Sequence, residues 1–84
     1  MKTLAETVPL MTSDDYCERF KAEYFQLKIR SHKLATLLKA WERGDFSCPP
    51  QVARCVLERQ LSQMLDYLST LALRAQFEGI SLEE

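Results

Sequence analysis

The fold is decided by residues 57–75, which read LERQLSQMLDYLSTLALRA. Apolar side chains recur there at alternating steps of four and three, so they fall on one stripe of an α-helix. The stripe consists of Leu57, Leu61, Met64, Leu68, Leu71 and Ala75, with Leu65 and Ala72 widening one flank. A helix with so long an apolar stripe must cover it against another element. The rest of the chain is expected to supply that element.

The composition is that of a small folded chain without a strong charge bias. Its 84 residues allow one domain at most, and 46% hydrophobic with 27% charged residues is ordinary for a folded protein. The formal net charge of −1 gives no overall attraction to nucleic acid or to an acidic membrane surface. The sequence contains neither a signal-peptide pattern nor an apolar run of about 18 residues. We therefore expect a cytoplasmic protein that binds neither duplex nucleic acid nor membrane.

The cysteines and the single histidine show no metal or disulfide pattern. Cys17, Cys48 and Cys55 are odd in number and form no CxxC pair, which favours reduced thiols over a disulfide framework. With His32 they could be counted as a zinc set, but their spacings match no finger or knuckle. The chain also lacks a glycine-rich phosphate loop and a nucleophile next to its histidine. The sequence predicts no metal, no cofactor, no catalytic residue and no enzymatic activity.

A second long helix is predicted earlier in the chain. The stretch Thr12-Ser13-Asp14-Asp15 offers capping side chains and the acidic residues that suit a helix N-terminus. No Pro or Gly follows before Gly44, so the helix should run to Arg43. The face that should meet residues 57–75 contains Cys17, Phe20, Tyr24, Leu27, Ser31, Leu34, Leu38 and Trp41. Residues 1–11 precede this helix as a flexible N-terminal arm, because Pro9 disfavours helix at Val8.

Residues 44–50, GDFSCPP, are predicted to form the turn between the two helices. Gly44 can adopt the positive φ that ends a helix, and Pro50 suits the first position of the next one. Phe46 is expected to fold back over the end of the helix pair.

The second helix should begin near Pro50 and end at Glu78, with Gly79 as its cap and Ile80 in apolar contact behind it. Two helices of similar length joined by so short a loop are antiparallel neighbours. The predicted fold is therefore all-α. It is an antiparallel two-helix hairpin, formed as a single domain by residues 12–80.

Such a thin hairpin is predicted to associate with further copies of itself. Ordering one residue costs about 1.5 kcal/mol, whereas each Å² of apolar surface buried contributes only about 25 cal/mol. One seam between two helices supplies too little area. On the helical wheel, further apolar side chains point away from or beside the seams: Phe25, Ile29, Leu37 and Leu73. Isolated surface hydrophobes are common, but this set favours a four-helix bundle or a larger ring.

The second half of the first helix is basic. Between Gln26 and Arg43 the only acid is Glu42, and the basic residues are Lys28, Arg30, Lys33, Lys39 and Arg43. Lys28, His32, Lys39 and Arg43 lie within roughly 60° of one another on the wheel. This stripe could hold a phosphate-bearing ligand, with cations on the phosphate and an aromatic ring against a base. It could also be a solvated face whose aliphatic stems lie over a seam.

Individual positions resemble a known group of proteins. The matching segments are Tyr16-x-x-Arg19-Phe20-x-x-Glu23-Tyr24-x-x-Leu27, Leu34-x-x-Leu37-Leu38 and Leu57-x-x-Gln60-Leu61-x-x-Met64-x-x-Tyr67-Leu68-x-x-Leu71-x-x-Arg74. In these the chain resembles small helical proteins of tailed bacteriophages, relatives of a crAss-like-phage reading frame. The resemblance spans residues 16–75, and Gln60, Met64, Tyr67 and Arg74 are its most specific members. The N-terminal arm and the Pro-Pro turn depart from it.

The resemblance implies a biological context without a defined activity. Small non-catalytic phage proteins often block host defences, either as oligomeric sponges for nucleotide immune signals or by binding a host protein. As a sponge, this protein would trap a cyclic nucleotide between protomers. The candidates for binding its phosphates and base are Lys28, Arg30, Lys33, Tyr24 and Tyr67. A host defence protein would instead be bound through an apolar patch around Phe25 and Ile29, and a structural or regulatory phage role is the third alternative.

Overall fold

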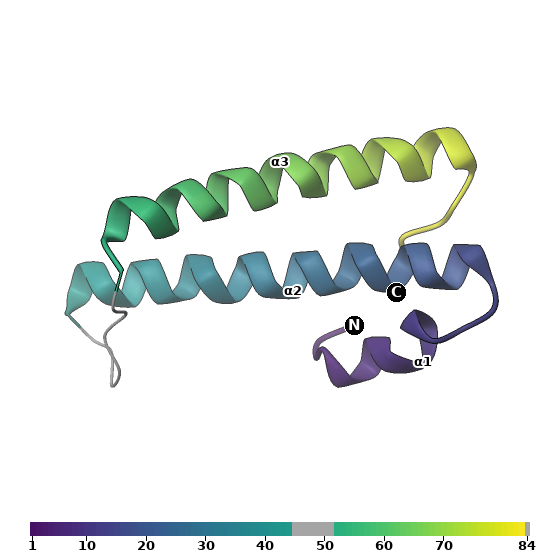
Figure 1. Cartoon of the computed structure of the whole chain (residues 1–84), viewed down its shortest axis with the longest axis horizontal. Helices are drawn as coiled ribbons and strands as arrows, with labels where there is room; N and C mark the ends of the chain where they lie inside the picture. Colours follow the sequence, from purple (N-terminus) through teal and green to yellow (C-terminus); the bar gives the residue numbers. More distant parts are fainter. Residues whose placement is uncertain (45–51, 84) are drawn as a thin grey trace.

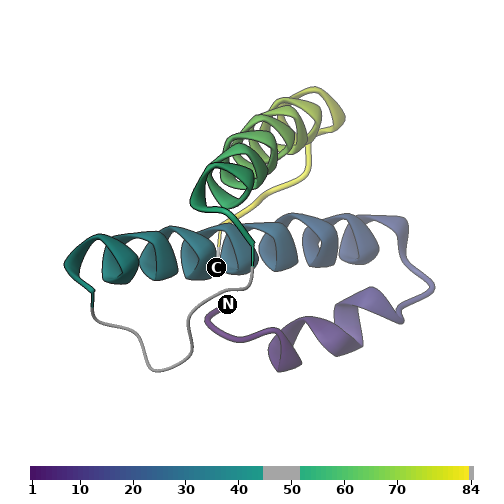
Figure 2. The same ribbon diagram turned by 60° about the vertical axis from the view of Figure 1, so that its left-hand side comes forward.

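The computed structural model describes residues 1–44 and 52–83. It contains a 3-10 turn, η1 (Ala5–Thr7), a short helix, α1 (Val8–Met11), and two long helices, α2 (Tyr16–Arg43) and α3 (Arg54–Glu78). The long helices lie side by side and antiparallel, and α1 lies on the side of α2 opposite to α3 (Figures 1 and 2). The predicted all-α hairpin is confirmed, and a short N-terminal helical segment adds a third layer.

Both ends of α2 are defined by local hydrogen bonding and glycine. Asp15 is extended, and its carboxylate accepts a hydrogen bond from the Cys17 N–H at 3.0 Å, which makes it the N-cap. Gly44 ends the helix with a φ of 68°, a left-handed conformation that glycine adopts readily. The helix begins later than predicted because the Thr12 hydroxyl bonds back to the Val8 carbonyl and ends α1 instead.

The C-terminal end of α3 follows the prediction, whereas its start does not. Gly79 caps the helix with a φ of 71°, and the Ile80 N–H donates to the Ala75 carbonyl at 2.9 Å. Ile80 also packs against the core, so the predicted apolar contact behind the glycine is confirmed. The helix begins at Arg54, later than predicted. Pro50 and Phe46, on which predictions for the turn were made, lie outside the described residues.

The hairpin is best packed at the end where α2 begins and α3 ends. Phe20, Leu71 and Ala75 form a buried cluster there. The partly buried apolar side chains around it are Tyr24, Leu27, Ile80 and Leu82. Toward the turn the stripe of α3 is less covered, since Leu57, Leu61, Met64 and Leu68 are only half-buried. Most of the predicted seam of α2 is buried or half-buried, but Cys17 is exposed.

The N-terminal segment, residues 1–11, covers a face that was predicted to be open. Phe25 and Ile29 are only 3% and 8% exposed, and their helical positions face away from α3. The elements packed against that side of α2 are η1 and α1. The prediction that Phe25 and Ile29 form an exposed oligomer or partner face is therefore wrong for the protomer. Of the other two residues of that predicted face, Leu37 is half-buried and Leu73 is exposed.

The structure also differs from the expectation of a loose arm. Val8 is the first residue of α1, and Pro9 occupies its first turn. A proline is tolerated in that position because the amide protons of the first turn have no partner within the helix. The effect of Pro9 on Val8 is thus outweighed by packing of the whole segment against α2.

Candidate functional site

A pocket of about 390 Å³ lies between the start of the chain and the middle of α2. Its lining consists of Met1, Lys2, Lys28, Ile29, His32 and Lys33. The aliphatic side chain of Ile29 is buried, whereas Lys2, Lys28 and Lys33 are exposed. The site therefore combines an apolar wall with a basic rim, and its size is within the range of small-molecule sites.

Helical geometry explains why α2 contributes four adjacent lining residues. Lys28 and His32 are four positions apart, as are Ile29 and Lys33, so the two pairs lie side by side over successive turns. The remaining wall comes from the N-terminal segment, which brings Lys2 to the same place. The basic side chains thus converge from two separate parts of the chain.

The three lysines of the rim have no acidic partner among the described residues. Within residues 1–44 and 52–83, side-chain ion pairs join Arg54 to Glu42 and Glu58, and Arg74 to Glu78. None of them involves Lys2, Lys28 or Lys33. Lysines held close together create a local positive potential on a chain whose net charge is near zero. This rim is therefore suited to an anionic ligand.

An aromatic ring lies beside the basic rim. The Lys28 Nζ atom is 6.0 Å from the centroid of the Tyr24 ring, a cation–π arrangement. Tyr24 is half-buried and meets Phe25 edge to face, with ring centroids 5.2 Å apart. Tyr24 does not line the pocket itself. Its ring lies next to the lysine that does.

The candidate residues predicted from sequence are divided between two sides of the hairpin. Lys28 and Lys33 line the pocket, and Tyr24 adjoins it. Arg30 lies two heptads after Tyr16, and Tyr67 one heptad before Arg74. Such spacings return to nearly the same helix face. Because Tyr16 and Arg74 are bonded to each other, Arg30 and Tyr67 belong to that side and not to the pocket.

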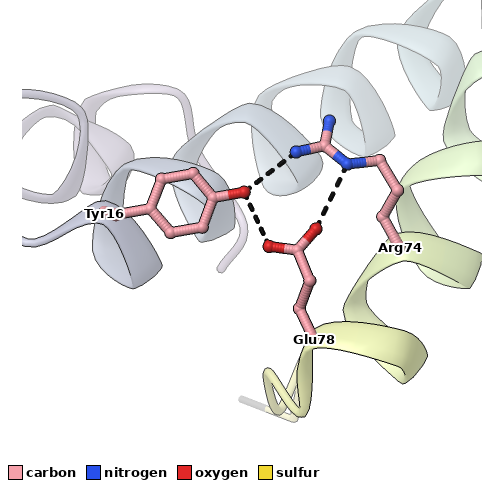
Figure 3. A network of polar contacts seen from close by, with 3 residues as sticks. All are labelled: Tyr16, Arg74 and Glu78. Carbon is pink, nitrogen blue, oxygen red and sulfur yellow. Dashed lines mark hydrogen bonds and ion pairs between the residues drawn. The ribbon is translucent and has the colours of Figure 1, made fainter.

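That second side carries a polar network at the end of the hairpin (Figure 3). The Tyr16 hydroxyl donates to Glu78 Oε1 at 2.7 Å and accepts from Arg74 Nη2 at 2.9 Å. Arg74 Nε pairs with Glu78 Oε2 at 3.4 Å, and its guanidinium lies 4.9 Å from the centroid of Phe20. The hydrogen bond that Tyr16 donates to Glu78 raises the pKa of Tyr16, and the one that Arg74 donates to Tyr16 raises the pKa of Arg74. These groups satisfy one another and fasten α2 to α3, so they offer a ligand little.

Sequence reasoning missed Lys2 and left His32 out of the candidate set. Lys2 was missed because the N-terminal arm was predicted to be loose. The available signal was the spacing of Leu4, Thr7 and Leu10, which are buried or half-buried and recur every three residues. That period is typical of a 3-10 turn. It is too short a pattern to stand out from the sequence alone.

The described part of the chain offers neither a metal site nor a membrane-crossing helix. No group of three or more His, Cys, Asp or Glu side chains in it is arranged to hold a metal ion. Cys17 and Cys55 are exposed free thiols there, while Cys48 lies outside it. Among the described helices, none combines the length with the apolar character that crossing a membrane requires.

Comparison with known proteins identifies a related family. Residues 14–77 match the family model described as Sequestin. The matched stretch contains α2 and nearly all of α3, and it begins after η1 and α1. No curated protein and no solved structure shows significant similarity to the chain.

Proposed function

Because this chain belongs to the Sequestin family, we propose that it is a non-catalytic protein that sequesters a small phosphate-bearing ligand. The family name is consistent with sequestration. The observation that carries the ligand class is the basic rim of the pocket, where Lys2, Lys28 and Lys33 have no acidic partner among the described residues. Ammonium groups bind phosphate as point charges, and several of them together suit a phosphate diester or diphosphate.

The proposed ligand is a cyclic nucleotide that serves as an immune signal. Its phosphates would lie on the lysines, and its base would stack against Tyr24 beside Lys28. The sequence hypothesis placed such a pocket between protomers, whereas the structure has a pocket within one protomer. A ligand site complete in each copy needs no symmetry partner to bind its phosphates.

We place the protein in a phage-infected cell, where sequestering the signal would block a host defence. This biological setting rests on the resemblance to small helical proteins of tailed bacteriophages. It requires the protein to act in the host cytoplasm, where such signals accumulate. A binding protein of this kind needs only to supply more binding sites than the number of signal molecules that the cell produces.

Self-association is a separate part of the proposal, and α3 supports it. The protomer exposes 5980 Å², whereas a compact monomer of 9.8 kDa exposes roughly 5200 Å². The protomer therefore exposes more surface than a compact monomer of its mass, as its extents of 42 × 24 × 19 Å imply. Large apolar side chains are exposed around α3: Val56, Leu65, Tyr67, Leu73 and Phe77. A helix that is apolar on so many sides is normally buried, and a second copy is the occupant that we propose.

The alternative is direct binding of a host protein, as an inhibitor or adaptor. The patch around Phe25 and Ile29 is not available for this, because both side chains are buried. Leu73 and Phe77 are four positions apart on the outside of α3, and Phe77 is 82% exposed. If α3 does not meet a second copy, this pair is the place where a protein partner would dock.

A thermal-shift screen tests the sequestration proposal. Purified protein is heated with a panel of cyclic di- and trinucleotides, and its melting temperature is recorded. A ligand present at about 100 times its Kd should stabilise the native state by about 2.7 kcal/mol. The paired substitution Lys28→Glu with Lys33→Glu should abolish the shift while leaving the helical circular dichroism spectrum unchanged.

The matched control is Arg30→Glu with Lys39→Glu. It makes the same change in charge on the same helix at two exposed residues outside the pocket. This variant should retain the ligand-induced shift. If no nucleotide shifts the wild-type protein and one host protein co-purifies with it, sequestration is wrong and the alternative holds.

A further inference from the structure

We propose that the N-terminal segment, residues 1–11, is a clasp that closes over the bound anion. In this clasp Lys2 is a ligand-binding residue and Gln26 is the positioning residue that holds the segment in place. The inference rests on the proposed function, because it concerns the same pocket. It goes beyond it in stating that ligand binding and docking of the segment onto α2 depend on each other.

The first observation is the composition of the basic rim. Lys28, His32 and Lys33 are all carried by α2 and keep their places as long as that helix is formed. Among the lysines that line the pocket, Lys2 is the one that α2 does not carry. Its distance from the others depends on where the segment lies. An anion on Lys28 and Lys33 therefore attracts Lys2 only when the segment is docked.

The second observation is a pair of hydrogen bonds that joins α2 to the N-terminal segment. Gln26 Nε2 donates to the Thr7 hydroxyl at 2.9 Å and to the sulfur of Met11 at 3.3 Å. Thr7 is fully buried, and its hydroxyl in turn donates to the Leu4 carbonyl at 2.6 Å. One side chain of α2 thus holds both the 3-10 turn and the end of α1. Gln26 does not line the pocket, so it has no direct route to a ligand.

The third observation is the small size of the elements in the segment. η1 has three residues and α1 has four, and helices this short are not stable without tertiary contacts. Val8 and Met11 are each 47% exposed, so only part of the segment's apolar surface is covered. Undocking also uncovers Phe25 and Ile29, which favours the docked state. Docking is therefore a local equilibrium that can open without global unfolding.

Coupling follows from these three observations by linkage. A ligand that binds the docked state more tightly shifts the local equilibrium toward it. By reciprocity, any change that weakens docking lowers the apparent affinity, in proportion to the fraction of docked molecules that is lost. The Sequestin match begins at residue 14, so the matched stretch contains the α2 wall of the pocket and not the clasp.

Inorganic pyrophosphate is the probe that tests the clasp on the full chain. Calorimetry gives its Kd, and NMR measures amide hydrogen exchange at Thr7 and Thr12, whose N–H groups bond within the segment. Pyrophosphate should slow exchange at both amides. Lys2→Ala should raise the Kd about 3-fold, as expected for one exposed charge pair. Gln26→Leu should raise it by up to about the same factor, because an undocked segment withdraws Lys2 from the anion and leaves the lining residues of α2 in place.

The control variants are Lys39→Ala, an exposed lysine of α2 outside the pocket, and Gln76→Leu, an exposed glutamine of α3. Both should leave the Kd and the exchange rates unchanged, and all four variants should keep the wild-type helical spectrum. If Gln26→Leu or Lys2→Ala binds pyrophosphate like the wild type, or if exchange in the segment ignores the ligand, the clasp is wrong and sequestration stands. If the wild type does not bind pyrophosphate, the clasp is also wrong, and the cyclic-nucleotide screen decides the proposed function separately.

Discussion

The two long helices differ in how much of their surface the protomer covers. α2 is packed on two opposite sides, by α3 and by the N-terminal segment, and its buried residues are Phe20, Ala22, Phe25, Ile29, Ser31, Leu34 and Leu38. α3 is packed on one side, and only Leu71 and Ala75 are buried. The two helices therefore differ in what they contribute to the structure. α2 lies between two other elements and carries the lining of the pocket, whereas α3 leaves large apolar side chains exposed.

The largest expected effect is on the doubly covered helix. Phe25→Ala removes a buried ring from under the N-terminal segment and should cost about 3–5 kcal/mol of unfolding free energy. Urea unfolding followed by circular dichroism measures this cost. Tyr24→Ala serves as a comparison, since that neighbouring ring is only half-buried. A cost within about 0.5 kcal/mol for Phe25→Ala would show that the segment does not cover it in solution.

The two sides of α3 are compared by a second pair of substitutions. Leu71 is 0% exposed, and Leu71→Ala should cost about 2–5 kcal/mol. Leu73→Ala, on the outside of the same helix, should cost no more than about 0.5 kcal/mol in a monomer. Unfolding curves at two protein concentrations measure both costs. If Leu73→Ala costs much more, and more at the higher concentration, its side chain is buried between copies.

Self-association itself is tested by charging the outside of α3. Leu73→Glu with Phe77→Glu should convert an assembly of the 9.8-kDa chain into protomers at micromolar concentration. Light scattering coupled to size exclusion gives the mass. Gln60→Glu with Gln63→Glu adds as much negative charge to α3 without replacing an apolar side chain, and it should remain assembled. A wild-type protein that is monomeric from the outset would remove this part of the proposal.

The smallest expected effect concerns the polar network that joins the two helices. Because the Glu78 hydrogen bond raises the pKa of Tyr16 in the folded state, the stabilisation it gives is present below the unfolded-state pKa of about 10. It is lost as the pH rises through the folded-state value. Urea midpoints at about pH 9 and about pH 11 should therefore differ more for the wild type than for Tyr16→Phe. Equal differences in the two proteins would show that the hydrogen bond does not form.

The long helices and their pairing were predictable from sequence, because a four-three apolar repeat over many turns has few other interpretations. Gly44 and Gly79 marked two of the four ends correctly. The N-terminal segment was not predictable in the same way. Its short helical turns are stabilised by contacts with α2, so neither the propensity of its residues nor Pro9 indicates its structure.

The sequence analysis named two of the residues that line the pocket. The basic character of α2 pointed to Lys28 and Lys33, and both are lining residues in the structure. Basic character alone did not distinguish these two lysines from Arg30, which does not line the pocket. A choice by residue type ignores the direction in which each side chain leaves the helix. Lys2 could not be added without knowing that the segment folds back onto Ile29. The second wall of the pocket is a tertiary feature, which only the arrangement of the whole chain provides.

The position of the best-packed contacts determines how the hairpin forms. Phe20 packs with Leu71, and Tyr16 bonds with Glu78, so these contacts join residues that are far apart in sequence. Near the turn, Glu42 and Arg54 are close in sequence, but their ion pair is partly exposed and contributes little. If only the contacts beside the turn have formed, the chain has already lost conformational entropy by closing the loop. It has not yet buried the apolar side chains at the other end of the helix pair. States in which the helices are paired only near the turn should therefore be sparsely populated. The pair of helices should form in one cooperative step.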